Sequence, residues 1–352
     1  MSFMPFDCHN IIMDMPPIGP WMQYRYVKTP LDSLKMLADA GATVALEFNQ
    51  WDLTETAKGV YDWSHTDEMI ARARSAGMRV LLMCAQNPPT WFPDDWYVWN
   101  EAGVPIRTFD PLNPVTVWAA ISPWNFEAMM HYNEYITMCC ERYNSDEVLC
   151  IGSFSGSGEA FLPPGIAAVY DPWAIRSYQQ FVGNRNAMPD MRQPDTQTWV
   201  LDSLLLMTIA QMDIYCESSV YREIWMQAHP YYSTYSPFSG NTNLIDTYTS
   251  VHNTVRPDTM NALLFTVFDN GHDSFIFPFI EQLKANGIQV WGGGEWSAGL
   301  SRNTPRAIGC GLRGLVTAPL HPYLSHYEVE PWEIAAVYNS AQEFRQCQPI
   351  TA

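Results

Sequence analysis

The chain has 352 residues, 47% hydrophobic and 16% charged, enough for one large barrel or two small domains with a sizeable core. Its 19 lysines and arginines against 37 aspartates and glutamates give a net charge of −18. A protein with this much negative charge repels phosphate groups and anionic lipid. We therefore expect neither a nucleic-acid partner nor a membrane partner. The N-terminus has no visible signal peptide, and no apolar run approaches the ~20 residues of a membrane helix. We therefore expect a cytoplasmic or otherwise soluble protein.

The cysteine and glycine patterns predict no cofactor and no metal. The eight cysteines are scattered without the spacing of a zinc site, and most lie in apolar stretches typical of free, buried thiols. The run Gly292-Gly293-Gly294 lacks the spacing of a dinucleotide fingerprint. The 14 tryptophans, 18 tyrosines and 16 phenylalanines exceed what a core takes up. Since aromatic faces also stack on sugar rings, this excess is compatible with a carbohydrate cleft.

Short apolar runs alternate with helical patterns along the whole chain, which is typical of repeated βα units and a parallel sheet. The runs predicted as strands are residues 10–14, 43–48, 79–84, 148–154, 223–227, 262–268, 289–291 and 314–318. The segments predicted as helices are residues 30–40, 65–76, 126–143, 199–215, 243–253, 274–286, 304–309 and 331–344. Eight strands with eight helices predict a single-domain (β/α)8 TIM barrel over residues 1–352.

The residues between the predicted helices and strands support these element boundaries. Gly41, Gly77 and Gly287 each follow a predicted helix and precede a strand, as C-terminal glycines of helices do. Three βα connections are long, at about residues 85–125, 160–198 and 228–242. All three leave the carboxyl ends of strands, where barrels of this type build their active sites.

Two glutamates each follow an apolar run and a group of glycines. Glu159 ends the segment Ser155-Gly156-Ser157-Gly158-Glu159, and Glu295 follows Gly292-Gly293-Gly294. By the strand count, Glu159 follows the fourth strand and Glu295 the seventh, so we expect both at the mouth of the barrel. Two carboxyl groups that face each other across a sugar are what glycoside hydrolysis requires.

Polar and aromatic residues after other strands are candidates for sugar binding. They are Asp14 after the first strand, Glu47 at the end of the second, His229 after the fifth, His321 after the eighth, and Trp91 and Trp296 as stacking platforms. Glu47 has an alternative role as the ion-pair partner of an arginine such as Arg25. A single histidine is as compatible with a structural hydrogen bond as with a ligand contact.

Several stretches carry a family resemblance. They are Gly59-Val60-Tyr61-Asp62-Trp63 followed by Asp67, Ile70, Ala73, Gly77 and Val80, then Pro88-Pro89-Thr90-Trp91, Ser122-Pro123 and Glu141-Arg142-Tyr143. These segments, within about residues 43–160, resemble the corresponding region of clan A glycoside hydrolases, especially the family 42 β-galactosidases. The C-terminal third resembles the clan more loosely, through Glu295 and Leu312-Arg313-Gly314. The resemblance implies a retaining β-glycosidase, with Glu159 as general acid/base and Glu295 as nucleophile.

The sequence departs from the clan at one position. Clan members usually carry Asn immediately before the acid/base, where this chain has Gly158, and Ser157 or Asn270 is a candidate to take over its sugar contact. The predicted partner is an oligosaccharide or polysaccharide, with galactosides favoured only by the resemblance. An endo-acting β-glucanase or β-mannanase and a non-catalytic carbohydrate-binding barrel remain alternatives. The sequence leaves the oligomeric state open.

Overall fold

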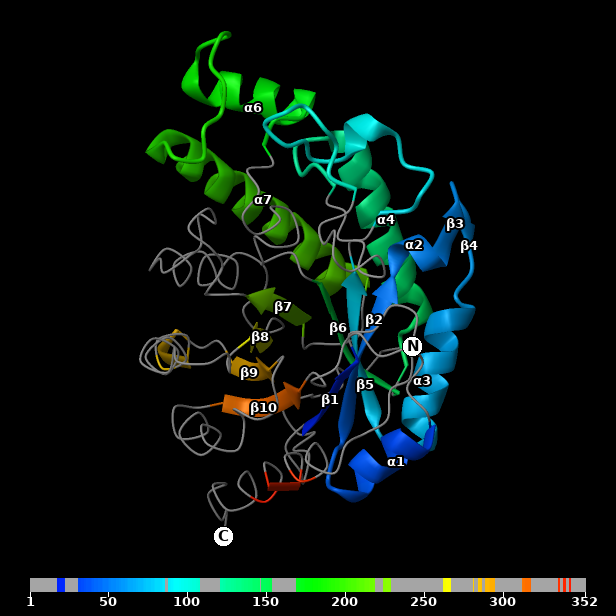
Figure 1. Ribbon diagram of the computed structural model, residues 1–352. Helices are drawn as coiled ribbons and strands as arrows, with labels where there is room; N and C mark the ends of the chain where they lie inside the picture. Colours follow the sequence, from blue (N-terminus) through cyan, green and yellow to red (C-terminus); the bar gives the residue numbers. More distant parts are fainter. Residues whose placement is uncertain are drawn as a thin grey trace, which may run out of the picture.

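The computed structural model describes residues 18–22, 31–85, 88–107, 121–145, 147–153, 169–218, 224–228, 262–266, 281, 284–286, 289–294, 312–317, 335, 338–339 and 342. Its main sheet is a closed barrel of parallel strands in the order β1-β10-β9-β8-β7-β6-β5-β2, in which β1 pairs with both β10 and β2 (Figure 1). The strands are β1 (Ile18–Met22), β2 (Val44–Gln50), β5 (Arg79–Ala85), β6 (Val148–Ser153), β7 (Ile224–Ala228), β8 (Ala262–Thr266), β9 (Gln289–Gly294) and β10 (Leu312–Thr317).

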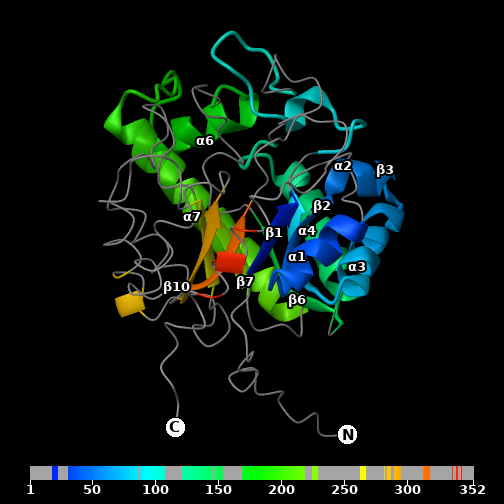
Figure 2. The ribbon, with the colours of Figure 1, turned by 60° about the horizontal axis from the view of Figure 1, so that its bottom comes forward.

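Helices follow the first strands of the barrel in turn. They are α1 (Leu31–Asp39) after β1, α3 (Ser64–Ser75) after β2, α4 (Phe126–Arg142) after β5, and α6 (Pro172–Val182) and α7 (Pro194–Ser218) after β6. Smaller elements follow the carboxyl ends of β2 and β5: the short helix α2 (Trp51–Thr54), the hairpin β3 (Glu55–Ala57) and β4 (Val60–Tyr61), and the 3-10 turn η2 (Asp94–Trp96). Figures 1 and 2 show α1, α3 and α4 beside β2 and β5, with α6 beyond the carboxyl ends of these strands. No helix among the described residues is long and apolar enough to cross a membrane.

The predicted α/β alternation is confirmed where the structure describes it. Seven predicted strands match β2 and β5 to β10, and four predicted helices match α1, α3, α4 and α7. Gly41 and Gly77 have positive φ angles of 111° and 82°, as expected after helices. The predicted helices at 243–253 and 304–309, with Gly287, lie outside the described residues.

The prediction for the first strand was wrong. The strand that closes the barrel is β1 at Ile18–Met22, whereas the prediction was residues 10–14. Two other boundaries also differ. β9 continues through the three glycines to Gly294, and the predicted loop 160–198 contains α6.

The residues of the family resemblance join α3 to α4. The Asp67 carboxylate accepts hydrogen bonds from the Arg142 guanidinium and from Tyr143 Oη, the latter at 3.0 Å. Trp63, directly before α3, stacks on Tyr135 of α4 with ring centroids 6.3 Å apart. Gly59 donates its N–H to Glu55 Oε1 at 2.8 Å and has a φ of 72°, which favours glycine. These residues therefore hold together the helices and the hairpin outside the ring of strands.

Candidate active site

The strands that precede the two predicted catalytic glutamates both belong to the barrel. β6 and β9 are separated in the ring by β7 and β8, and all four strands run parallel. Their carboxyl ends therefore lie on one rim, the active face of this architecture. β9 ends at Gly294, so Glu295 is the next residue in the chain. Glu159 comes six positions after Ser153, the end of β6, and both glutamates lie outside the described residues.

The glycines before Glu295 are part of the barrel wall. Gly292, Gly293 and Gly294 pair with Leu315, Val316 and Thr317 of β10, and the first two also pair with Phe265 and Thr266 of β8. Pairing on both sides compensates for the low strand preference of glycine. Because these residues lack side chains, the last part of β9 adds no side chain to either face of the barrel wall.

Most other candidate sugar-binding residues follow a strand but lie outside the described residues. His229 directly follows β7, which ends at Ala228, and Asn270 and His321 come four positions after the ends of β8 and β10. Ser157 and Trp296 adjoin the two glutamates and also lie outside the described part.

The basis for the prediction on Asp14 changes. It was predicted to follow the first strand, but β1 begins at Ile18, so Asp14 precedes that strand in the chain. The reason for placing it at the carboxyl rim therefore no longer holds. The position of Asp14 itself lies outside the described residues.

Glu47 also requires a correction, because β2 presents it to the helices. Asn49, two residues later on the same unbroken strand, directs its side chain to Thr66 of α3 and Cys139 of α4. Since alternate residues of a strand share one face, Glu47 lies on this helix side of the barrel. It is 2% exposed, and Oε1 has no hydrogen-bond partner. A side chain held there does not reach a sugar in the mouth.

Burial dominates the environment of the Glu47 carboxyl. Burial raises the pKa of the Glu47 carboxyl well above its usual range, and the positive charge of Arg72 on α3 opposes this shift. Arg72 forms an ion pair with Glu68, and Arg25, the partner that the sequence suggested for Glu47, lies outside the described residues. Glu47 is a group of the strand–helix interface.

Trp91 belongs to an aromatic cluster in the connection between β5 and α4. Its ring makes T-shaped contacts with Phe92, Trp96 and His131, with centroids 4.7, 6.2 and 5.9 Å away. Phe92 in turn contacts Trp51, the residue directly after β2, at 4.9 Å. The cluster thus lies beside the carboxyl ends of β2 and β5 and holds the half-buried Trp91 in a fixed orientation.

A polar network at Asn49 holds the carboxyl ends of β2 and β5, and sequence reasoning missed it. Asn49 Oδ1 accepts hydrogen bonds from Thr54 Oγ1 at 2.9 Å and from Thr66 Oγ1 at 2.8 Å. Tyr135 Oη donates to the backbone oxygen of Asn49 at 2.6 Å, and Tyr132 Oη donates to that of Cys84 at 3.1 Å. The hydroxyls of Tyr132 and Tyr135 in α4 therefore fix the carboxyl ends of β2 and β5. The loops that follow these strand ends form what we call the loop layer.

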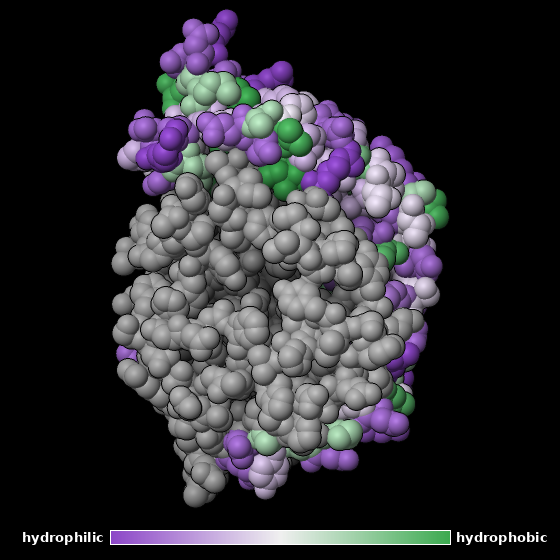
Figure 3. Space-filling model, in the orientation of Figure 1, coloured by the Kyte–Doolittle hydropathy of each residue, from purple (hydrophilic) through white to green (hydrophobic). Residues whose placement is uncertain are grey.

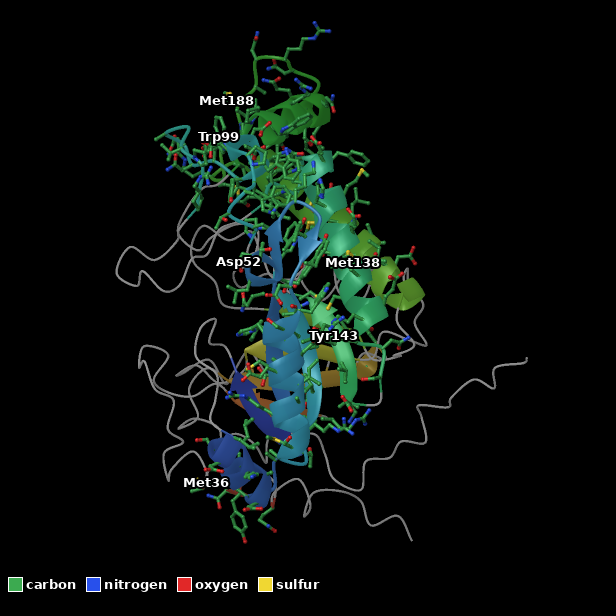
Figure 4. The ribbon with its side chains drawn as sticks, turned by 90° about the vertical axis from the view of Figure 1, so that its right-hand side faces the viewer. Met36, Asp52, Trp99, Met138, Tyr143 and Met188 are labelled. Carbon is green, nitrogen blue, oxygen red and sulfur yellow. The ribbon has the colours of Figure 1, made fainter. Side chains whose placement is uncertain are left out.

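The long connections after β5 and β6 meet above the strand ends. Ser122 Oγ, just before α4, donates to Asp171 Oδ1 at 3.0 Å, and both residues are fully buried. Asp171 also caps α6 by accepting from the N–H groups of Trp173 and Ala174. Burial raises the pKa of Asp171 to about 6, although these hydrogen bonds lower it. Figure 4 shows Trp99 and Met188 at this end and Met36 of α1 at the other.

Two further predictions concern packing and metals. Cys84, Cys139 and Cys140 are buried, as predicted. Trp124 and Trp199 stack on each other at 4.5 Å and join the start of α4 to α7. Among the residues that the structure describes, no three His, Cys, Asp or Glu side chains form a metal-binding group.

Comparison with known proteins gives the fold. No family model matches the sequence, and no curated protein sequence matches it. Among solved structures, the catalytic domain of a β-amylase from Paenibacillus polymyxa is similar at a TM-score of 0.68 and 12% identity, over 95% of this chain and 99% of that one. A β-galactosidase from the psychrophilic Marinomonas ef1 is similar at 0.65 and 13% identity, over 94% of this chain and 59% of the other.

A β-galactosidase from Bacillus circulans sp. alkalophilus gives a similar result, with a TM-score of 0.65, 12% identity, and 94% and 56% of the two chains covered. The chain thus spans somewhat over half the length of these galactosidases and nearly all of the β-amylase catalytic domain. At identities this low, the likeness establishes a fold shared with these carbohydrate-active proteins.

Proposed function

We propose that the protein is a retaining glycoside hydrolase with a single (β/α)8 domain, similar to the family 42 β-galactosidases, that cleaves β-linked oligosaccharides or polysaccharides. The observation that supports this most is the placement of β6 and β9. These strands lead to Glu159 and Glu295, and their carboxyl ends share one rim of the barrel. The fold shared with β-galactosidases supports the same reaction class.

In the proposed reaction, Glu159 donates its proton to the glycosidic oxygen while the Glu295 carboxylate attacks the anomeric carbon. The bond to the leaving group breaks as the glycosyl–Glu295 bond forms. Water then attacks the anomeric carbon, gives its proton to Glu159 and releases Glu295. This order requires Glu159 to be protonated and Glu295 to be ionised near neutral pH, so the pair should give a bell-shaped pH dependence of kcat/KM. Trp91 and Trp296 would stack on the sugar.

A second candidate is hydrolysis of an amylose-type glucan, favoured by the match with the β-amylase catalytic domain over nearly its full length. The stereochemistry of the reaction depends on the distance between the Glu159 and Glu295 carboxyl groups. Inversion at the anomeric carbon would need them about 6.5–9.5 Å apart, whereas retention would need roughly 5 Å. The initial anomer of the released sugar, followed by NMR, distinguishes these two stereochemical outcomes.

A panel of aryl glycosides and oligosaccharides, including β-galactosides, β-glucosides, β-mannosides and amylose fragments, tests the proposal. We expect turnover of at least one substrate and a fall of several orders of magnitude in Glu159→Gln and Glu295→Gln. Glu141→Gln is the control, because Glu141 is an exposed residue of α4 and should leave turnover unchanged. Sugar binding without any turnover would instead indicate a carbohydrate-binding barrel, the alternative that Gly158 favours.

A further inference from the structure

The segment that carries Glu159 lies between two fixed points. On one side it leaves β6 at Ser153, within the barrel wall. On the other side the chain returns at Val169, which is fully buried, and enters α6 at Pro172. Whatever holds this second point also limits where Glu159 can lie, because a connection fixed at both ends has fewer conformations than one fixed at one end.

The second point is held by the neighbouring connection, the one between β5 and α4. Tyr170 donates its backbone N–H to Trp99 O at 3.2 Å, and Asp171 Oδ1 accepts from Ser122 Oγ at 3.0 Å. Ser122 is itself fixed, since its N–H donates to Trp96 O at 2.8 Å. Figures 1 and 2 both show α6 close to the cyan connection before α4.

Burial makes this junction stiff. Ser122 and Asp171 are fully buried, and one oxygen of Asp171 serves both the bridge to Ser122 and the cap of α6. Losing Asp171 would leave the buried Ser122 hydroxyl and the first N–H groups of α6 without their acceptor, which costs more than losing an exposed hydrogen bond. Movement of the junction is therefore opposed from both connections.

We propose that Ser122 and Asp171 position the segment that carries Glu159, by fixing the end at which this segment returns to α6. This inference rests on the proposed function. Ser122 and Asp171 are positioning residues, since they act on the reaction through Glu159. A misplaced general acid slows the departure of poor leaving groups, which need protonation, much more than that of good ones.

Ser122→Ala tests the inference with two aryl glycosides of the same sugar. We expect kcat/KM for the phenyl glycoside to fall about tenfold or more, within the range that a general acid contributes. The value for the dinitrophenyl glycoside should change less than about twofold, since this leaving group needs little protonation. Ser203→Ala is the matched control. Ser203 lies in α7 and accepts a hydrogen bond from Trp124 Nε1, so this variant also loses one serine hydroxyl but keeps both Ser122 and Asp171. Equal losses on both substrates in Ser122→Ala would overturn the proposal.

Hydrogen exchange separates this inference from the proposed function. Amides in residues 154–168 should exchange faster in Ser122→Ala than in the wild type or Ser203→Ala, even if no glycoside is cleaved. Unchanged exchange would overturn the inference while leaving the reaction class intact. Should Ser122→Ala not fold, Asp171→Ser gives the same test, because serine still caps α6 but its shorter side chain withdraws from Ser122.

Discussion

The interface between the strands and the helices differs from the loop layer above the strands in how it uses buried polar groups. At the interface, Asn49 joins α2, α3 and α4 to the end of β2 through its side chain and backbone oxygen. In the loop layer, Ser122 and Asp171 join two long connections to each other. The first network holds the barrel together, whereas the second sets where a connection lies. We therefore expect changes in the first to alter stability alone and changes in the second to alter catalysis as well as stability.

Replacing Asn49 with alanine should give the largest loss of stability. The hydroxyls of Thr54 and Thr66 would lose their acceptor inside the protein, so we expect the free energy of unfolding to fall by about 3–4 kcal/mol. Chemical denaturation measures this loss. Asn184→Ala, an exposed residue after α6, should cost about 0.5 kcal/mol or less. A similar cost for both would show that the Asn49 network does not hold the barrel.

The ionisation of Asp171 should make stability depend on pH. Its folded pKa of about 6 exceeds the ordinary value of 3.8, so its contribution to stability is fully present below about pH 4 and is lost as the pH rises through 6. The difference in unfolding free energy between wild type and Asp171→Asn should therefore shift by about 2.4 kcal/mol against the wild type between pH 4 and pH 7. A difference that does not vary with pH would contradict this account of Asp171.

Glu47→Gln should have the smallest effect on the reaction. Because Glu47 lies on the helix side of β2, we expect kcat and KM on the best glycoside to stay within about twofold of the wild type, as for changes remote from a site. A tenfold rise in KM alone would return Glu47 to the sugar-binding residues and would contradict its assignment to the interface.

The sequence predicted the parts of the fold that local patterns determine. Seven strands are apolar runs bounded by glycine, proline or polar residues, so their pattern alone sufficed. The strand β1 reads Ile-Gly-Pro-Trp-Met, which has a poor local strand pattern, and its pairing with β2 and β10 decides it. The helix α6 had a signal that was missed, since Asp171 and Pro172 form a typical N-cap and first helical residue, with Gly183 at the other end.

The candidate site depended more on long-range contacts. Placing glutamates after β6 and β9 needed only the strand count. The direction of Glu47 needed its register and the helix that covers it, and the bridge between Ser122 and Asp171 joins residues 49 positions apart. Polar side chains of this kind look alike in a sequence whether they face a substrate or a helix. The hairpin at Gly59 and the ion pair of Asp67 with Arg142 show that residues resembling a family of enzymes can also have a purely structural role.

The configuration of the product formed with azide tests the pairing of Glu159 and Glu295 most directly. With an activated aryl glycoside, Glu159→Ala should regain turnover in azide and release a glycosyl azide of retained configuration, because Glu295 still forms the covalent intermediate. Glu295→Ala should yield only the inverted azide, since azide then attacks the substrate directly. NMR of the two products gives the answer. The opposite pattern would reverse the two roles, and full activity of either variant without azide would contradict the paired-glutamate mechanism.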